Sequence, residues 1–227
     1  MTGERSGEEH VRDWAGLHMT EPPGGFVGGW LKASAAVARP LVRAGVSPNM
    51  VTIAAVIAGV AAVPLATIDG WPGPAAGCLA VVVSGLLDSL DGAVAVQAGR
   101  ATKVGFLLDS VLDRLADAAF PAALAIVAGD GAWVAVGAVG ACWWLEYIRA
   151  RASLADASAG ERQLVTPGER PTRVVLTAVG LGIPPLALAA LWGHVVIVGA
   201  SAVLLLAHSL VRLRRRDGDP GPPAPTA

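Results

Sequence analysis

Five aspartates stand inside apolar stretches of this chain, where acidic side chains are costly. Asp88 and Asp91 lie three residues apart, and Asp109, Asp113 and Asp117 follow at intervals of four. On helices, these spacings place Asp88 with Asp91 on one face and the other three aspartates on one face of a second helix. Because a carboxylate is expensive to hold in hydrocarbon, acids in such segments usually serve a function. The pattern predicts a functional carboxylate cluster.

The chemistry expected of such a cluster is binding of divalent metal. Several carboxylates close together cannot all stay ionised unless cations neutralise them. Ligand sets made only of carboxylate oxygens suit Mg²⁺, Mn²⁺ or Ca²⁺ better than zinc. A structural alternative covers part of the set, because Arg114 could pair with one acid and a lone aspartate can cap a helix. For Asp117 the two interpretations are equally good.

Six apolar segments carry these residues or lie beside them, each close to the roughly 20 residues that cross a bilayer. They span residues 50–67, 75–96, 104–128, 132–152, 174–191 and 195–213. Turn-forming residues separate them at 69–74, 129–131 and 193–194. Residues 30–43, interrupted by Pro40, mix apolar and basic side chains as an interfacial helix does. We expect an all-α integral membrane protein with six transmembrane helices preceded by an interfacial juxtamembrane helix.

The second and third segments hold the acids, and the connection between them is short. We therefore expect these two helices to pack antiparallel, with their acidic faces at similar depth. Cys78 and Cys142 lie within apolar runs without CxxC spacing, so each is predicted to be a small buried hydrophobe.

Composition and charge support this organisation. Charged residues make up 15% of the chain, against about 25% in soluble domains, and the net charge of −1 suggests no nucleic-acid partner. Lys and Arg gather before the first segment, between the second and third, between the fourth and fifth, and after the sixth. The positive-inside rule then predicts a multi-pass protein of the cell membrane with both termini cytosolic. Residues 1–25 and 214–227 are expected to be disordered cytosolic tails around a membrane domain at 26–213.

The two acidic stretches form one spaced motif. It reads Asp88-x-x-Asp91-Gly92-x-x-Ala95-Val96, eight residues, then Gly105-x-x-x-Asp109-x-x-x-Asp113. This motif resembles the signature of the CDP-alcohol phosphotransferases, membrane enzymes that make phospholipids. Seven of the eight fixed positions match, and the family has arginine where this chain has Val96. Residues 47–52 resemble the opening of the family's first span, and 146–151 and 169–173 resemble its acceptor-side segments, especially in bacterial phosphatidylinositol-phosphate and phosphatidylglycerophosphate synthases.

The resemblance implies an activity and a role for each matched residue. The activity is metal-dependent transfer of a phosphatidyl group from a CDP-alcohol, such as CDP-diacylglycerol, to an acceptor alcohol, with release of CMP. Two Mg²⁺ or Mn²⁺ ions and a homodimer in the lipid bilayer are implied as well. The implied metal ligands are Asp88, Asp91, Asp109 and Asp113. Asp113 would also be the catalytic base. The implied contacts of the CDP-alcohol are Asn49, Thr52, Gly92, Ala95 and Gly105.

Two departures from the family pattern affect the substrates. Arg100 follows Val96 by one helical turn, if the helix continues, and could supply the missing charge to the donor phosphates. Glu146 stands where users of inositol phosphate carry serine, and an acid there would repel a phosphorylated acceptor. Glu146 either pairs with Arg149 on one helix face or faces the acceptor.

The acceptor is left open by the sequence. Arg149, Arg170 and Arg173 form a basic surface suited to a phosphate, although positive-inside topology explains them equally well. Inositol phosphate, glycerol phosphate and other alcohols are all candidates. Two other classes of function are a small ion or proton transporter, which would spread its acids through the membrane, and a weak or inactive family member that acts as a membrane partner.

Overall fold

The computed structural model describes residues 8–9, 11–12, 25–155 and 164–217, and no strand occurs among them. The prediction of an all-α protein is confirmed. The longer elements are α2 (Gly25–Arg43), α3 (Pro48–Ala66), α4 (Pro72–Ala98), α5 (Lys103–Ala128), α6 (Ala132–Ala155), α7 (Arg170–Gly182), α8 (Ala187–Gly193) and α9 (Gly199–Asp217). A 3₁₀ turn, η1 (Pro184–Leu186), precedes α8, and a π-helical turn, η2 (His194–Val198), joins α8 to α9.

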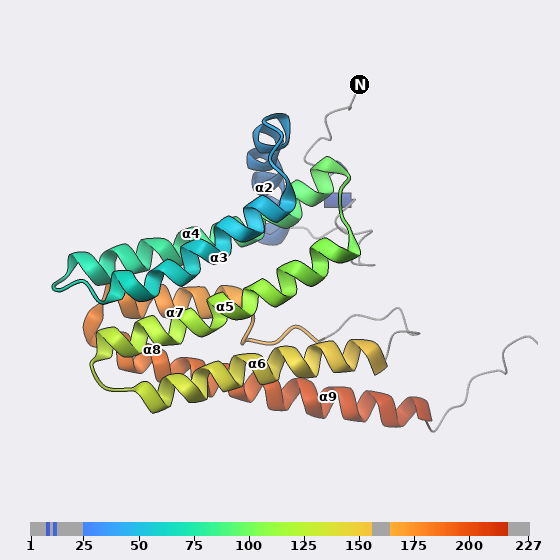
Figure 1. Ribbon diagram of the computed structural model, residues 1–227. Coiled ribbons are helices and arrows are strands. Elements are labelled where there is room, and N and C mark those ends of the chain that lie inside the picture. The colour runs from blue at the N-terminus through green and yellow to red at the C-terminus, as the bar shows by residue number, and fades with distance from the viewer. Residues whose placement is uncertain (1–7, 10, 13–24, 156–163, 218–227) are drawn as a thin grey trace, which may run out of the picture.

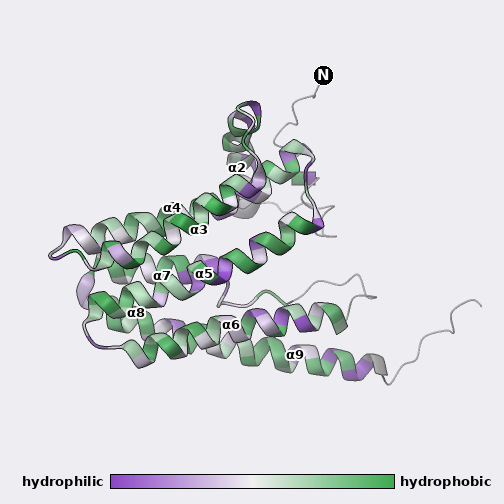
Figure 2. Ribbon diagram, in the orientation of Figure 1, coloured by the Kyte–Doolittle hydropathy of each residue, from purple (hydrophilic) through white to green (hydrophobic). Residues whose placement is uncertain are grey.

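From α3 onward the helices run back and forth along one bundle, and α2 forms a separate arm across the end where α3 begins (Figure 1). The ends of α4, α6 and α9 and the start of α5 lie at that same end of the bundle. The apolar colour dominates the bundle in Figure 2, whereas hydrophilic colour gathers at this end and at a patch beside α5 and α7. The ends of α4, α6 and α9, which lead into basic stretches of the sequence, therefore lie toward one end of the bundle.

Three helical stretches of the described chain are long and apolar enough to cross a membrane: Pro48–Ala66, Pro72–Ala98 and Pro184–Arg215. The helix α5 has the length, but Asp113, Arg114 and Asp117 interrupt its apolar sequence. The helix α7 has only 13 residues, which span about 20 Å. Three of the described helices thus qualify by length and composition, and the six-span layout stays a prediction.

The predicted break at residues 193–194 is wrong. Helical structure continues from α8 through η2 into α9. The α-helix is instead interrupted earlier in the sequence, at Ile183 and the 3₁₀ turn η1. Two consecutive prolines, Pro184 and Pro185, lack the N–H groups that a continuing helix would need. Gly193 instead serves packing, because a Cβ there would lie 3.2 Å from a methyl group of Leu176 in α7.

The helices α4 and α5 run in opposite directions, as expected (Figure 1), but their direct contact with each other is small. The helix α3 packs along both of them. A Cβ added to Gly59 of α3 would lie 2.9 Å from Ser84 Oγ of α4 and 3.0 Å from Ala116 Cβ of α5. Because glycine has no side chain, α3 can approach both neighbours at this level and separate them.

The expectations for α2, the end of α9, the two tails and the two cysteines are met in part. Pro40 lies inside α2 rather than interrupting it, so that expectation was wrong. The helix α9 continues to Asp217, four residues beyond the boundary expected at 213. Of the two expected tails, residues 1–7, 10, 13–24 and 218–227 lie outside the described residues. Cys142 is buried, as predicted, whereas Cys78 is only partly buried.

Candidate active site

Three aspartates from two helices come together at the end of the bundle where α4 finishes and α5 starts. One carboxylate oxygen from each of Asp88, Asp91 and Asp109 lies within 4.8 Å of the other two. The register of α5 is fixed by Thr102, whose hydroxyl accepts a hydrogen bond of 3.0 Å from the Gly105 N–H and so starts the helix. The predicted meeting of the two acidic faces is confirmed for these three residues.

The donor set fits a divalent cation such as Mg²⁺ or Mn²⁺. All three groups are carboxylates, which are the hard oxygen ligands that these ions prefer. In addition, Asp109 Oδ1 is buried and has no hydrogen-bond partner in the described part of the chain. A buried polar atom without a partner is costly, and a bound cation would satisfy it.

Asp91 is the most firmly held of the three. Its carboxylate is buried. The hydroxyl of Thr52, on α3, donates a hydrogen bond of 2.7 Å to Asp91 Oδ2. The N–H of Gly92 donates one of 2.6 Å to Oδ1. Each oxygen therefore has a fixed direction before any ligand binds.

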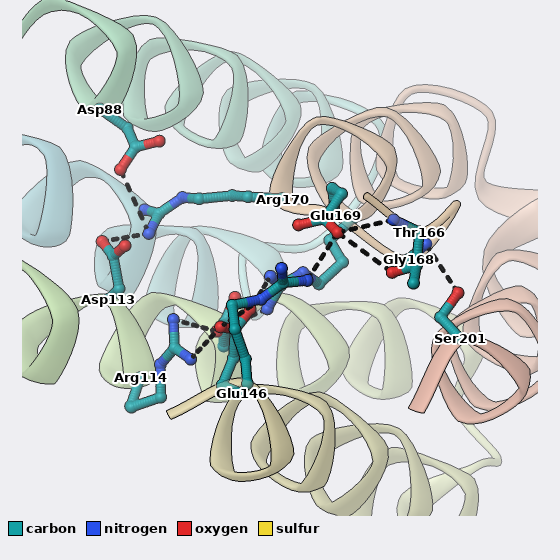
Figure 3. Close-up of polar contacts among 12 residues, drawn as sticks. Asp88, Asp113, Arg114, Glu146, Thr166, Gly168, Glu169, Arg170 and Ser201 are labelled. Atoms are coloured by element: carbon teal, nitrogen blue, oxygen red, sulfur yellow. Dashed lines mark hydrogen bonds and ion pairs between the residues drawn. The ribbon is translucent and has the colours of Figure 1, made fainter. Parts of the chain in front are cut away.

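Asp113, predicted as a fourth metal ligand and as the base, lies one turn beyond Asp109 on α5. Its carboxylate pairs with an arginine side chain of the protein. Arg170, the first residue of α7, forms ion pairs with Asp113 and, at 3.3 Å, with Asp88 (Figure 3). Burial lowers the pKa of Arg170, but the Asp88 and Asp113 carboxylates raise it by more, so the net shift is upward. Arg170 therefore stays charged and bridges the two helices through their acids.

A second ionic cluster lies deeper in the bundle. Asp117 is fully buried and pairs with Arg173 at 2.7 Å and with Arg114 at 3.1 Å. The alternative that Arg114 neutralises one acid is confirmed, and Asp117 belongs to this cluster rather than to the three-aspartate group. Glu146 pairs with Arg149 at 3.5 Å, as one of the two interpretations predicted, and also with Arg173 and Arg114.

The family model for CDP-alcohol phosphatidyltransferase matches residues 45–208, a stretch that contains every one of these side chains. The chain belongs to the CDP-alcohol phosphatidyltransferase family. It is therefore a transferase of phospholipid biosynthesis, as the motif indicated.

Curated relatives of this phosphatidyltransferase act in inositol-lipid synthesis. Archaetidylinositol phosphate synthase of Aeropyrum pernix is 31% identical over 79% of this chain and 91% of its own length. Phosphatidylinositol phosphate synthase of Mycolicibacterium smegmatis is 35% identical over 69% of this chain and 71% of its own.

Solved structures of the Mycobacterium tuberculosis phosphatidylinositol phosphate synthase share the fold. The complex with manganese and citrate has a TM-score of 0.65 and 29% identity, and covers 78% of this chain and 88% of that one. The structure with CDP-DAG bound has a TM-score of 0.62 and 30% identity, and covers 78% and 92%.

Two of the predicted donor contacts, Thr52 and Gly92, are hydrogen-bonded to the Asp91 carboxylate. A Cβ added to Gly92 would meet nothing within 4 Å, so helix packing does not account for that glycine. A Cβ on Gly105 would lie 3.3 Å from Asn49 Oδ1, so this glycine lets α5 approach the start of α3. Thr52 contacts Asp91, and Ala95 is partly buried on α4.

The placement of Arg100 differs from the expectation. The helix α4 ends at Ala98, and Gly99 adopts a left-handed conformation with φ of 61°. Arg100 therefore does not continue the helix face of Val96; it is exposed beyond the helix end. Its contact with the donor phosphates stays a prediction.

Glu169 was expected only as part of the segment 169–173 and not as a residue of the site. Glu169, at the start of α7, accepts hydrogen bonds from the N–H and hydroxyl of Thr166, at 2.9 and 3.1 Å, and pairs with Arg149 at 2.6 Å. Glu169 is the N-cap of α7 but makes no side-chain cap hydrogen bond, and its partner Arg149 is 20 residues away, so no local pattern pointed to this pairing.

Proposed function

We propose that this chain transfers a phosphatidyl group from CDP-diacylglycerol, or another CDP-alcohol, to the hydroxyl of an acceptor alcohol and releases CMP. The main support is that carboxylate oxygens of Asp88, Asp91 and Asp109 lie within 4.8 Å of one another. Asp113 of the same motif follows one turn later on α5. The manganese complex of the tuberculosis enzyme supports metal dependence. The proposal includes two ions, Mg²⁺ or Mn²⁺, held by these three residues together with Asp113.

When bound, the metal would neutralise the donor pyrophosphate and stabilise the departing CMP. The protein supplies the orientation. Thr52 and the Gly92 N–H fix the Asp91 carboxylate, and the open surface at Gly92 leaves room for the donor to approach the backbone. The tuberculosis enzyme with CDP-DAG bound supports this choice of donor. Asn49, Ala95, Gly105 and Arg100 are the further donor contacts of the proposal.

Asp113 is the proposed base, which takes the proton from the acceptor hydroxyl as that oxygen attacks the phosphorus. It lies one turn from Asp109 on α5, and the ion pair with Arg170 orients its carboxylate. A base must be within hydrogen-bond reach of the proton that it removes. The position of Asp113 beside Asp88 and Asp109 meets this requirement for an acceptor bound at the same edge.

The proposed membrane arrangement has six spans, both termini in the cytosol, and α2 at the interface of the cell membrane. The alternating course of the helices in Figure 1 supports six passes, and the position of the ends of α4, α6 and α9 at one end of the bundle supports the orientation. The site would then lie at the cytosolic edge, where lipid tails stay in hydrocarbon and cytidine stays in water. The homodimer implied by the family resemblance is part of the same proposal.

The test is turnover by the purified full chain in detergent with CDP-diacylglycerol, Mg²⁺ or Mn²⁺ and a panel of alcohols. CMP release that needs both metal and an alcohol, and that Asp91→Asn abolishes, supports the proposal. Asp130→Asn, in an exposed turn at the opposite end of the bundle, is the matched control and should be fully active. Absence of metal-dependent CMP release with every alcohol would overturn the proposal in favour of an inactive family member. Family membership already disfavours an ion transporter.

A further inference from the structure

Three arginines converge on one carboxylate beside the candidate base. Arg173 Nη2 donates a hydrogen bond of 2.7 Å to Glu146 Oε1. Arg114 Nη1 and Arg149 Nε each lie 3.5 Å from Glu146 Oε2. These side chains come from α5, α6 and α7, so Glu146 is the point at which three helices are joined by charge (Figure 3).

The cluster is neutral as a whole. Asp117 pairs with Arg114 and Arg173, and Glu169 pairs with Arg149. The three guanidinium groups are thus balanced by three carboxylates among the described residues. The side chain of Arg173 is 2% exposed and that of Glu146 19%. Buried charges of this kind are stable only when they are paired, and breaking one pair is costly.

This cluster lies one helical turn from the candidate base on two helices. Asp117 follows Asp113 by four residues on α5, and Arg173 follows Arg170 by three on α7, spacings that keep each pair on one helix face. Arg170 pairs with Asp113, and Arg173 pairs with Asp117 and Glu146. An acceptor whose hydroxyl is at Asp113 and whose body points along these faces would reach Glu146 and its arginines. The basic surface expected from the sequence is present, but Glu146 already occupies it with a carboxylate of the chain.

A phosphate monoester carries close to two negative charges at neutral pH. To reach Arg173, such a group would have to displace Glu146 or lie beside it, and like charges at short range in a partly buried site repel. A polyol has no such conflict, since its hydroxyl groups can donate hydrogen bonds to the Glu146 carboxylate. Specificity of this kind arises from repulsion of the wrong ligand.

We infer that Glu146 makes this chain select an acceptor alcohol that carries no phosphate group. This inference rests on the proposed transferase function. It differs from what the names of the relatives suggest, since those enzymes are named for phosphorylated products. Glu146 acts here as a specificity residue, through its charge and through the arginines that it holds.

The experiment compares matched acceptors that differ only in a phosphate: inositol with inositol 1-phosphate, and glycerol with glycerol 3-phosphate. The full chain in detergent is assayed for CMP release with CDP-diacylglycerol and Mn²⁺. We expect the unphosphorylated member of at least one pair to have the higher kcat/KM. Glu146→Gln, which keeps a hydrogen-bond acceptor for Arg173, should shift the ratio toward the phosphorylated member by about tenfold or more.

A charge-balanced variant distinguishes a change in acceptor preference from a general loss of structure. Glu146→Gln combined with Arg114→Gln restores a neutral cluster and should lose the shift, whereas Asp130→Asn should leave the ratio unchanged. A general structural role of Glu146 would instead lower turnover with every acceptor in proportion. Wild-type preference for the phosphorylated member of both pairs would overturn the inference and leave the transferase function intact.

Binding provides a readout that needs no turnover. Inositol 1-phosphate should stabilise Glu146→Gln against thermal unfolding and should not stabilise the wild-type chain. Equal stabilisation of both proteins would refute the role of Glu146 even if no alcohol supported CMP release. Absence of CMP release with all four alcohols counts against the proposed function alone.

Discussion

The hydrogen bond from Thr52 to Asp91 offers a sharp test of how the metal site is built. Thr52→Val keeps the shape of the side chain and removes the hydroxyl, so Asp91 Oδ2 loses a donor at 2.7 Å while the carboxylate stays buried. The same hydroxyl also lies 3.3 Å from the Pro48 carbonyl, but its single proton goes to the shorter, charged acceptor.

The magnitude follows from the type of bond. A hydrogen bond to a charged group contributes about 1.5–3 kcal/mol, and loss of a partner that orients a metal ligand costs about 10–100-fold in metal affinity or activity. Only one of the two hydrogen bonds to Asp91 is lost, because the Gly92 N–H still holds Oδ1. We therefore expect the Mn²⁺ concentration for half-maximal activity to rise by about tenfold, near the lower limit.

The assay titrates Mn²⁺ against CMP release and, independently, against the melting temperature of the detergent-solubilised protein. Both midpoints should move together in Thr52→Val. Thr52→Ser restores the hydroxyl and should return both midpoints to those of the wild type. An unchanged Mn²⁺ midpoint in Thr52→Val would show that Asp91 does not bind the metal or does not depend on Thr52 for its orientation.

Three further predictions test other parts of the site. Asp109→Asn should abolish the Mn²⁺-dependent rise in melting temperature, which Asp130→Asn should retain. Gly92→Ala should fold normally, because a Cβ there meets nothing within 4 Å, but it should weaken donor binding. Gly180→Ala should instead lower the free energy of unfolding by about 1–3 kcal/mol, because its Cβ would lie 2.8 Å from Ala190 Cβ. Melting curves of the two variants distinguish these effects. Arg100→Ala should raise the KM for CDP-diacylglycerol by about tenfold, and an unchanged KM would show that the exposed arginine beyond α4 does not contact the donor.

The parts of the fold that the sequence predicted correctly are those governed by local rules. Spacings of three and four within a helix place side chains on one face, and this sufficed to bring Asp88 with Asp91 and to align Asp109 with Asp113. A short connection then placed the two acidic faces at the same level. The local rule failed at residues 193–194, because a glycine can also allow close contact between two packed helices, here with Leu176 of α7.

Ion pairs between helices depend on information that a single helix does not contain. The sequence permits Glu146 to pair with Arg149, three residues later, but gives no reason to join it to Arg173, 27 residues away. That contact depends on how the bundle brings the end of α6 near the start of α7, where the long side chains of Glu146 and Arg173 meet. Likewise, α3 contains no ionisable residue, yet its Gly59 lies in close contact with both helices that carry the acids.

The buried position of Val96 suits an apolar side chain better than the arginine of the family pattern. Val96 is 5% exposed, so a long charged side chain at that position would have to leave the packed interior to reach solvent or a ligand. The αL conformation of Gly99 ends α4 two residues later and carries the chain to the exposed Arg100. A charge placed after the helix end can approach the donor from the aqueous side without cost to packing. Burial of Val96 therefore fits the packing of α4, and the proposed contact of Arg100 with the pyrophosphate would come from beyond the helix end.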